Sequence, residues 1–247
     1  MVRAAALLAV ALIVGVYAAT HERLPNLSDW GDVAFLGLVV IPLTFALVWL
    51  ALPARELAGR QLVLGLAALA LIALAVVLSL AGLDIAANVV KLAAATAVGW
   101  WFLTFFEAAW WVVLVALLIV PVDLFSVARG PTRTITEEQP EVFDALSIAL
   151  PVAGERASAQ LGLPDVLFFA LFLGAAVRFG LRPNLSWVLM TLSFGGTLAV
   201  ALDEAGVAAL PLLSLAFVVV NGDRLWHSIR GRHGHEEPAA AVDHETR

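Results

Sequence analysis

The chain contains no cysteine, a single tyrosine and few charged residues for its length. Without cysteine it has no disulfide bonds and no metal sites built on thiolates. Charged residues occupy 14% of the 247 positions, whereas a soluble domain carries about 25%. The net charge of −6 arises largely in one loop and in the C-terminal tail, and it carries no signature of nucleic-acid binding.

Long apolar runs make up most of the sequence. Hydrophobic residues account for 62% of the chain, and the mean hydropathy is +0.96. The runs are continuous and rich in alanine and leucine, unlike the short alternating segments of a membrane β-barrel. Because the bilayer offers backbone groups no hydrogen-bond partners, such runs must form helices. We therefore expect an all-α fold, a single polytopic transmembrane helix bundle over residues 1–223, in the cell membrane.

Turn and charge signals divide this bundle into eight expected spans, each close to the roughly 20 residues of a membrane crossing. The expected spans cover residues 4–20, 33–53, 61–82, 85–105, 108–128, 163–180, 186–202 and 205–221. The break at Glu107 is the least marked, and without it the count falls to seven. A polar loop, 129–162, interrupts the bundle, and within it 142–150 is expected to form a short strand or helix. The tail, 224–247, is expected to be polar and disordered.

Basic residues in the short loops predict the orientation, because they concentrate on the cytoplasmic side. With eight spans, one side of the membrane carries Arg3, Arg55, Arg60, Arg178, Arg182, Arg224, Arg230 and Arg232. We therefore expect the tail to be cytoplasmic and the polar loop to lie outside.

Two aspartates lie within apolar runs that contain no basic residue. Asp123 falls in the run 110–127, and Asp165 opens the run 163–173. A carboxylate inside a spanning helix costs about 2.5–3.5 kcal/mol, so it usually marks a pathway or an active site. Because the two helices are antiparallel, both aspartates should lie at similar depth on the loop side, about 5–10 Å from the helix ends.

Two carboxylates at one depth can share a proton, which leaves one acid and one base near neutral pH. One can then deprotonate a water while the other protonates a carbonyl oxygen, with no metal and no cofactor required. Two structural readings remain open. Asp165 follows Pro164 and would suit a helix N-terminus, where the dipole favours negative charge. Asp123 would suit the membrane interface at the end of a long helix.

Three short motifs occur in order within residues 107–220: Val122-Asp123, Gly162-Leu163-Pro164-Asp165 and Ala209-Leu210-Pro211. They resemble those of the presenilin and signal peptide peptidase family of intramembrane aspartyl proteases, in a divergent, prokaryote-like form. That family has Tyr-Asp, Gly-x-Gly-Asp and Pro-Ala-Leu at these places. This chain departs from the pattern at three positions, which are Val122, Pro164 and Ala208.

The resemblance implies that Asp123 and Asp165 are the catalytic pair. It also implies that substrate is bound by Gly162, Leu163, Pro164, Ala209, Leu210 and Pro211. The implied substrate is a transmembrane helix or a remnant signal peptide, which must unwind locally to expose a peptide bond. The family has nine spans where eight are expected here, and the expected orientation is similar to that of signal peptide peptidase.

Two other functions stay open from the sequence. The three departures from the motifs are compatible with an inactive relative that binds membrane helices without cutting them. A proton-coupled transporter would use the same acids as relay groups, although transporters often show repeats between their halves and none is seen here. The sequence does not determine the oligomeric state.

Overall fold

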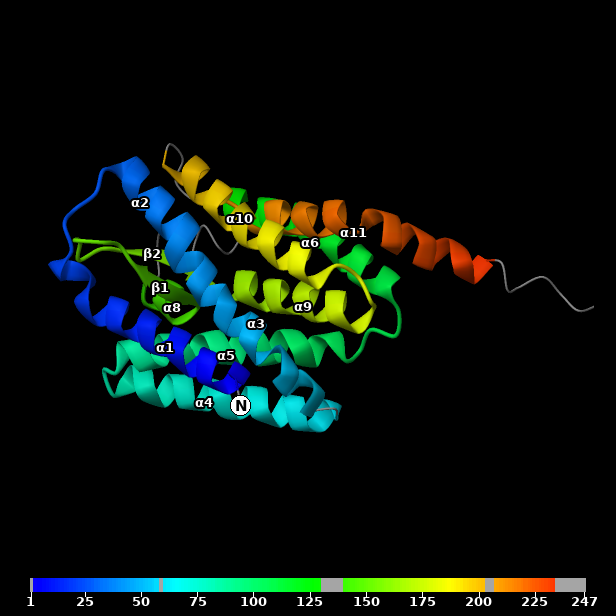
Figure 1. The fold of residues 1–247 in the computed structure, drawn as a ribbon, viewed down its shortest axis with the longest axis horizontal. Coiled ribbons are helices and arrows are strands. Elements are labelled where there is room, and N and C mark those ends of the chain that lie inside the picture. Colours follow the sequence, from blue (N-terminus) through cyan, green and yellow to red (C-terminus); the bar gives the residue numbers. More distant parts are fainter. Residues whose placement is uncertain (1, 58–59, 130–139, 203–206, 234–247) are drawn as a thin grey trace, which may run out of the picture.

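The computed structural model describes residues 2–57, 60–129, 140–202 and 207–233, in which long helices run back and forth along one axis (Figure 1). Six of the described helices are long and apolar enough to cross a membrane, which makes this a multi-pass membrane protein. They are Val2–Arg23, Asp29–Glu56, Gln61–Leu80, Asp84–Leu103, Ala109–Ala128 and Pro183–Ala201.

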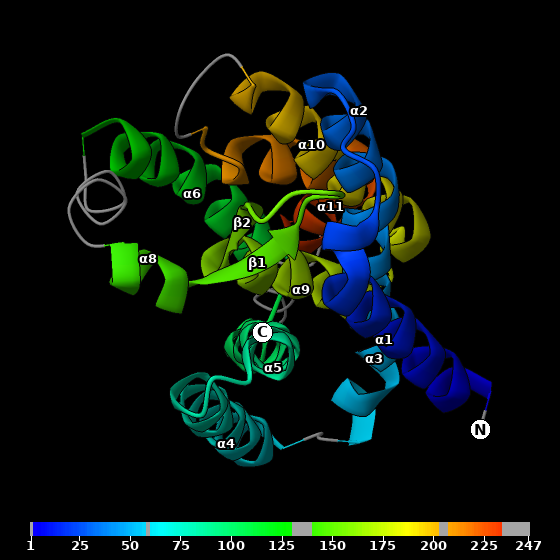
Figure 2. The same cartoon turned by 90° about the vertical axis from the view of Figure 1, so that its left-hand side faces the viewer.

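The elements follow in the order α1 (Val2–Thr20), a 3-10 turn (His21–Arg23), α2 (Asp29–Phe35), a π-helical turn (Leu36–Val40), α3 (Ile41–Leu57), α4 (Gln61–Leu80), α5 (Asp84–Leu103), α6 (Ala109–Arg129), α8 (Pro140–Ala145), β1 (Ser147–Pro151), β2 (Ser158–Gly162), α9 (Leu163–Arg178), α10 (Pro183–Ala201) and α11 (Leu210–His233). Glu107 lies between α5 and α6, so the chain does turn back there. A view along the bundle shows β1 and β2 lying across one end of it (Figure 2).

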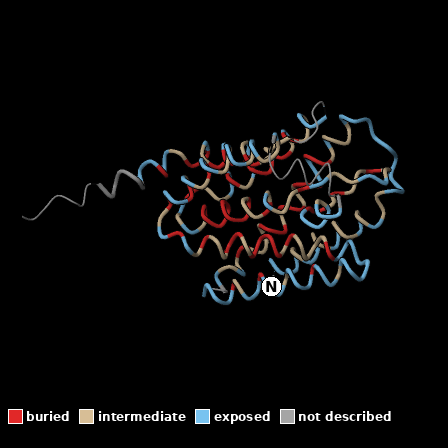
Figure 3. The backbone as a smooth tube through the Cα atoms, turned by 180° about the vertical axis from the view of Figure 1, so that it is seen from behind, coloured by how far each residue is buried: buried red, intermediate tan, exposed pale blue. Residues whose placement is uncertain are grey.

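Helix α9 forms the centre of the bundle. Its residues Phe169 to Leu173 have no exposed surface, and Phe169 stacks on Phe45 of α3 with ring centroids 3.9 Å apart. Buried residues gather along the central helices, whereas α4 carries mainly exposed positions (Figure 3). At 1.5 Å per residue the 16 residues of α9 extend about 24 Å, which is shorter than the six apolar helices. The count of eight spans therefore stays a prediction.

Helices α5 and α9 approach so closely at Gly99 that no side chain fits between them. A Cβ atom added at Gly99 would overlap the carbonyl oxygen of Leu167 and lie 3.2 Å from the amide nitrogen of Leu171. Both are backbone atoms, so they cannot move aside as a flexible side chain would. The contact makes Gly99 a packing residue of the bundle core.

We expect Gly99→Ala to lower the free energy of unfolding by about 1–3 kcal/mol, the usual cost of overpacking a core. Unfolding in mixed detergent micelles by SDS titration would measure the change. Gly196→Ala is the matched control, because Gly196 is also helical but has no heavy atom within 4 Å of an added Cβ. Equal losses of unfolding free energy in the two variants would show that the change from glycine to alanine in a helix, and not the contact between α5 and α9, causes the effect.

The β-hairpin is the main departure from an all-α fold. Strands β1 and β2 pair antiparallel, with Ser147 opposite Gly162 and Pro151 opposite Ser158. Within the expected polar loop the sequence alternates, so that Ile148 and Leu150 are buried. The segment expected to be either a strand or a helix is divided between the two, because α8 ends at Ala145 and β1 follows it.

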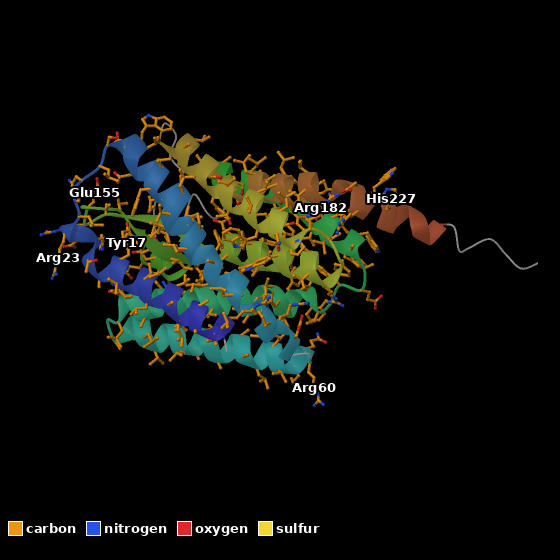
Figure 4. All side chains as sticks on the ribbon, in the orientation of Figure 1. Tyr17, Arg23, Arg60, Glu155, Arg182 and His227 are labelled. Carbon is orange, nitrogen blue, oxygen red and sulfur yellow. The ribbon has the colours of Figure 1, made fainter. Side chains whose placement is uncertain are left out.

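The N-terminal helices hold the tip of the hairpin. The hydroxyl of Tyr17 donates to the carbonyl oxygen of Pro151 at 2.6 Å, and the amide of Gly154 donates to the carbonyl of His21 at 2.8 Å. Gly154 has a φ of +76° and packs directly against Asn26, so the turn has no room for a side chain. Tyr17, Arg23 and Glu155 lie at this same end of the bundle (Figure 4).

Helix α11 continues to His233, beyond the residue at which the polar tail was expected to begin. Its extension is tied to the α9–α10 connection, since the guanidinium of Arg224 donates to the carbonyl oxygens of Gly180 and Leu181. Arg182 also binds Asp223 through two 2.6 Å hydrogen bonds. The remainder of the expected tail, 234–247, lies outside the described residues.

Candidate functional site

Asp123 reaches the candidate site from α6, two residues after Pro121. Its side chain is half-buried, and its Oδ2 accepts a hydrogen bond of 3.1 Å from the amide of Leu210. Leu210 is the first residue of α11, and the first amides of a helix have no acceptor within that helix. Asp123 therefore stabilises the start of α11 from a neighbouring helix.

Asp165 lies in the first turn of α9, directly after the hairpin. Gly162 is the N-cap residue, with a φ of −61° and a ψ of 139°. The amide of Leu163 donates to the carbonyl of Leu146 at 2.9 Å, so the amide of Gly162 points away from β1. The Asp165 side chain turns back toward Gly162, as the acid of a capping box does, since a Cβ added at Gly162 would lie 3.0 Å from its Oδ2. The expected preference of Asp165 for a helix N-terminus is therefore present in the fold.

The two carboxylates lie near each other where α6 contacts α9. Asp165 is half-buried, and it is close enough to Asp123 for their negative charges to repel each other. Two ionised carboxylates at such range are unfavourable, and one shared proton relieves the repulsion. The structure thus brings together Asp123, Asp165, the Gly162 amide and the Leu210 amide from four separate elements.

The remaining predicted site residues surround these groups at the starts of two helices. Leu163 is half-buried against the core, and Pro164 is exposed as the second residue of α9. Ala209 precedes α11 and accepts the amide of Leu213 at 3.2 Å, and Pro211 is the second residue of α11. A proline costs little at that position, because the missing amide would have no partner within the helix.

No protein-family model, curated protein or solved structure matches the chain. The site is therefore interpreted from its own geometry. Across the described ranges no group of three or more His, Asp and Glu side chains could hold a metal ion.

Lys91 supports the site in a way that the sequence does not reveal. It extends from α5, and its Nζ donates to the carbonyl oxygens of Asp144, at 2.7 Å, and Ser147, at 3.1 Å. Ser147 in turn donates from its hydroxyl to the side chain of Gln160 on β2 at 2.8 Å. The lysine therefore fixes the base of the hairpin that leads into Gly162. A lysine in an apolar helix indicates a polar partner, but the partner lies more than fifty residues away.

We expect Lys91→Met to loosen the hairpin. Hydrogen bonds to a charged group contribute about 1.5–3 kcal/mol, so amide hydrogen exchange in β1 and β2 should become about 10- to 100-fold faster. Exchange measured by mass spectrometry on the purified protein would detect this. Lys91→Arg keeps a charged donor and should retain most of the protection. Unchanged exchange in Lys91→Met would mean that the N-terminal contacts alone hold the hairpin.

Proposed function

We propose that the protein is an intramembrane aspartyl protease that uses Asp123 and Asp165 to hydrolyse a peptide bond. The observation that carries the proposal is the proximity of two carboxylates from different helices in an apolar bundle, one bound to the Leu210 amide and the other beside Gly162. A carboxylate that only caps a helix does not need a second carboxylate close enough to repel it. That costly arrangement is the one that acid–base catalysis by a shared proton requires.

The reaction would proceed without a covalent intermediate. The ionised carboxylate takes a proton from water while the protonated one donates to the carbonyl oxygen, and the water oxygen bonds to the carbonyl carbon. A proton then passes to the peptide nitrogen and the C–N bond breaks. The products are a new carboxyl group and a new amine, and the pair again holds one proton.

Substrate would lie beside the starts of α9 and α11. Gly162, Leu163 and Pro164 border Asp165, and Ala209, Leu210 and Pro211 border Asp123. The substrate class is a transmembrane helix or a remnant signal peptide. Such a helix must unwind at the cut site, because its peptide groups are shielded by its own hydrogen bonds. Water would have to reach the unwound segment from the hairpin end of the bundle, so that one water molecule can attack the peptide bond.

The three departures from the family motifs lie outside the hydrogen bonds that hold the carboxylates. Val122 has 62% of its surface exposed, on the side of α6 away from the core. Pro164 occupies a helix position that needs no amide. Ala208 is half-buried and precedes the residue that begins the α11 cap. Their positions favour an active enzyme over an inactive relative.

Cleavage of a transmembrane reporter peptide by the purified, full-length protein in liposomes tests the proposal. In water enriched in ¹⁸O, the new carboxyl terminus should gain one labelled oxygen, as hydrolysis of the peptide bond requires. Reporter binding without any cleavage would support the inactive relative instead. Proton-coupled flux that depends on Asp123 and not on Asp165 would support a transporter.

A further inference from the structure

The end of the bundle opposite the hairpin carries a second group of charged residues, independent of the carboxylate pair. The C-terminal ends of α3, α5 and α9 all lie at that end of the bundle (Figure 1). Arg55 lies near the end of α3, and Arg178 is the last residue of α9. Arg60 and Arg182 lie at the same end (Figure 4).

Arg178 is held in place by two contacts. Its Nη1 donates to the carbonyl oxygen of Leu103, at the end of α5, over 2.6 Å. Its guanidinium carbon lies 5.4 Å from the centroid of the Phe179 ring, within the range of a cation–π contact. Most of the donors of this fixed guanidinium remain available, since a guanidinium has five N–H groups.

Arg55 lies at this same end of the bundle and has an unmet hydrogen bond. Its side chain is half-buried, and its Nε is fully buried with no partner among the described residues. It is close enough to Arg178 for the two positive charges to repel. Glu56 attracts the Arg55 charge more strongly than Arg178 repels it, although within the described ranges no ion pair joins Glu56 to Arg55.

An anion between the two arginines would remove both unfavourable features. A buried donor without a partner costs about 1–3 kcal/mol, and repulsion between like charges adds to that cost. Phosphate oxygens suit guanidinium groups, which bind them with two parallel hydrogen bonds. The Nε of Arg55 would supply one such bond and the free donors of Arg178 the others.

We propose that Arg55 and Arg178 form a binding site for a phosphate group at this end of the bundle. Two sources carry this chemistry, an anionic phospholipid headgroup and free phosphate. The lipid is the source that the position favours, because the basic loops place this end at the expected cytoplasmic surface. The cytoplasmic leaflet is rich in anionic lipids, and basic pockets between spanning helices bind their headgroups.

Lipid-dependent stability of the full-length protein in a neutral detergent tests the site. The thermal unfolding midpoint would be measured while phosphatidylglycerol, phosphatidylcholine or inorganic phosphate is added. Phosphatidylglycerol should raise the midpoint of the wild type. Arg55→Gln and Arg178→Gln should need at least tenfold more of this lipid for the same rise. Arg60→Gln removes one charge at the same end and should behave as the wild type.

Two further results separate a binding site from a structural role. Without lipid, Arg55→Gln should unfold at the same or a higher temperature than the wild type, because the variant no longer buries an Nε without a partner. Arg55→Lys keeps the charge but lacks Nε, and it too should bind the lipid more weakly. A response to inorganic phosphate alone would support the site with a soluble ligand. Equal responses of all variants to phosphatidylglycerol, or an equal response to phosphatidylcholine, would overturn it.

Discussion

Replacing either Asp123 or Asp165 with asparagine should reduce the rate of cleavage of a transmembrane reporter by about 10³- to 10⁴-fold. Asparagine keeps the shape of the side chain and an oxygen that accepts the Leu210 or Gly162 amide. It cannot take or give a proton, so one of the two proton transfers is lost in each variant. General acid–base catalysis contributes effects of this size. Initial rates with the protein in liposomes would measure the loss.

The double variant should be no slower than either single one, because groups that act as a unit lose their whole effect when one is removed. Asp84→Asn is the matched control, since Asp84 is an exposed acid at the first residue of α5 at the hairpin end. It should cleave as fast as the wild type. Equal residual cleavage in wild type and both single variants would eliminate the protease proposal and leave a contaminating activity as the source.

The proximity of the two aspartates could be predicted from local sequence. Asp123 lies near the end of one apolar run and Asp165 near the start of the next, and antiparallel helices bring such positions to one depth. The break at Glu107 follows from the same reasoning, because a charged residue between two long runs favours a turn. The catalytic role of the pair stays a prediction, since capping contacts also account for each aspartate separately.

The hairpin and the supporting charges could not be predicted with the same certainty, because they depend on residues far apart in the sequence. The alternation in β1 is only five residues long, and its partner strand begins seven residues after β1 ends. Lys91 occurs in a helix with the pattern of an ordinary apolar span, and Arg55 falls in a loop expected between two spans. The packing of α3, α5, α8 and α9 places the Asp144 carbonyl that binds Lys91 and the Arg178 charge near Arg55.

The hairpin also gives the second motif a structural role, and its role in substrate binding stays a prediction. The motif was expected to bind substrate, with proline replacing a flexible glycine. In the fold it is the junction where β2 becomes α9, and Pro164 is compatible with the first turn of the helix. Gly162, and not residue 164, is the position at which the Asp165 carboxylate needs open space. A substitution at Gly162 can therefore displace the Asp165 carboxylate while leaving both carboxyl groups present.

Gly162→Ala should lower the rate of cleavage by about 100-fold while leaving the fold intact. The added Cβ would lie 3.0 Å from the Oδ2 of Asp165, closer than carbon and oxygen pack comfortably. The backbone accepts alanine, because the φ of Gly162 is −61°. The carboxylate is the end of a side chain and can rotate away, so the strain is relieved by moving it from Asp123. A displacement of about 1 Å in a catalytic group has effects of this size.

The loss should appear in kcat with KM nearly unchanged, and the unfolding midpoint should match that of the wild type. Gly196→Ala is the matched control, since it makes the same change in α10, where an added Cβ meets no heavy atom within 4 Å. A Gly162→Ala enzyme with full kcat would mean that Asp165 does not act from the position in which β2 and α9 hold it. A selective rise in KM would instead assign Gly162 to substrate contact.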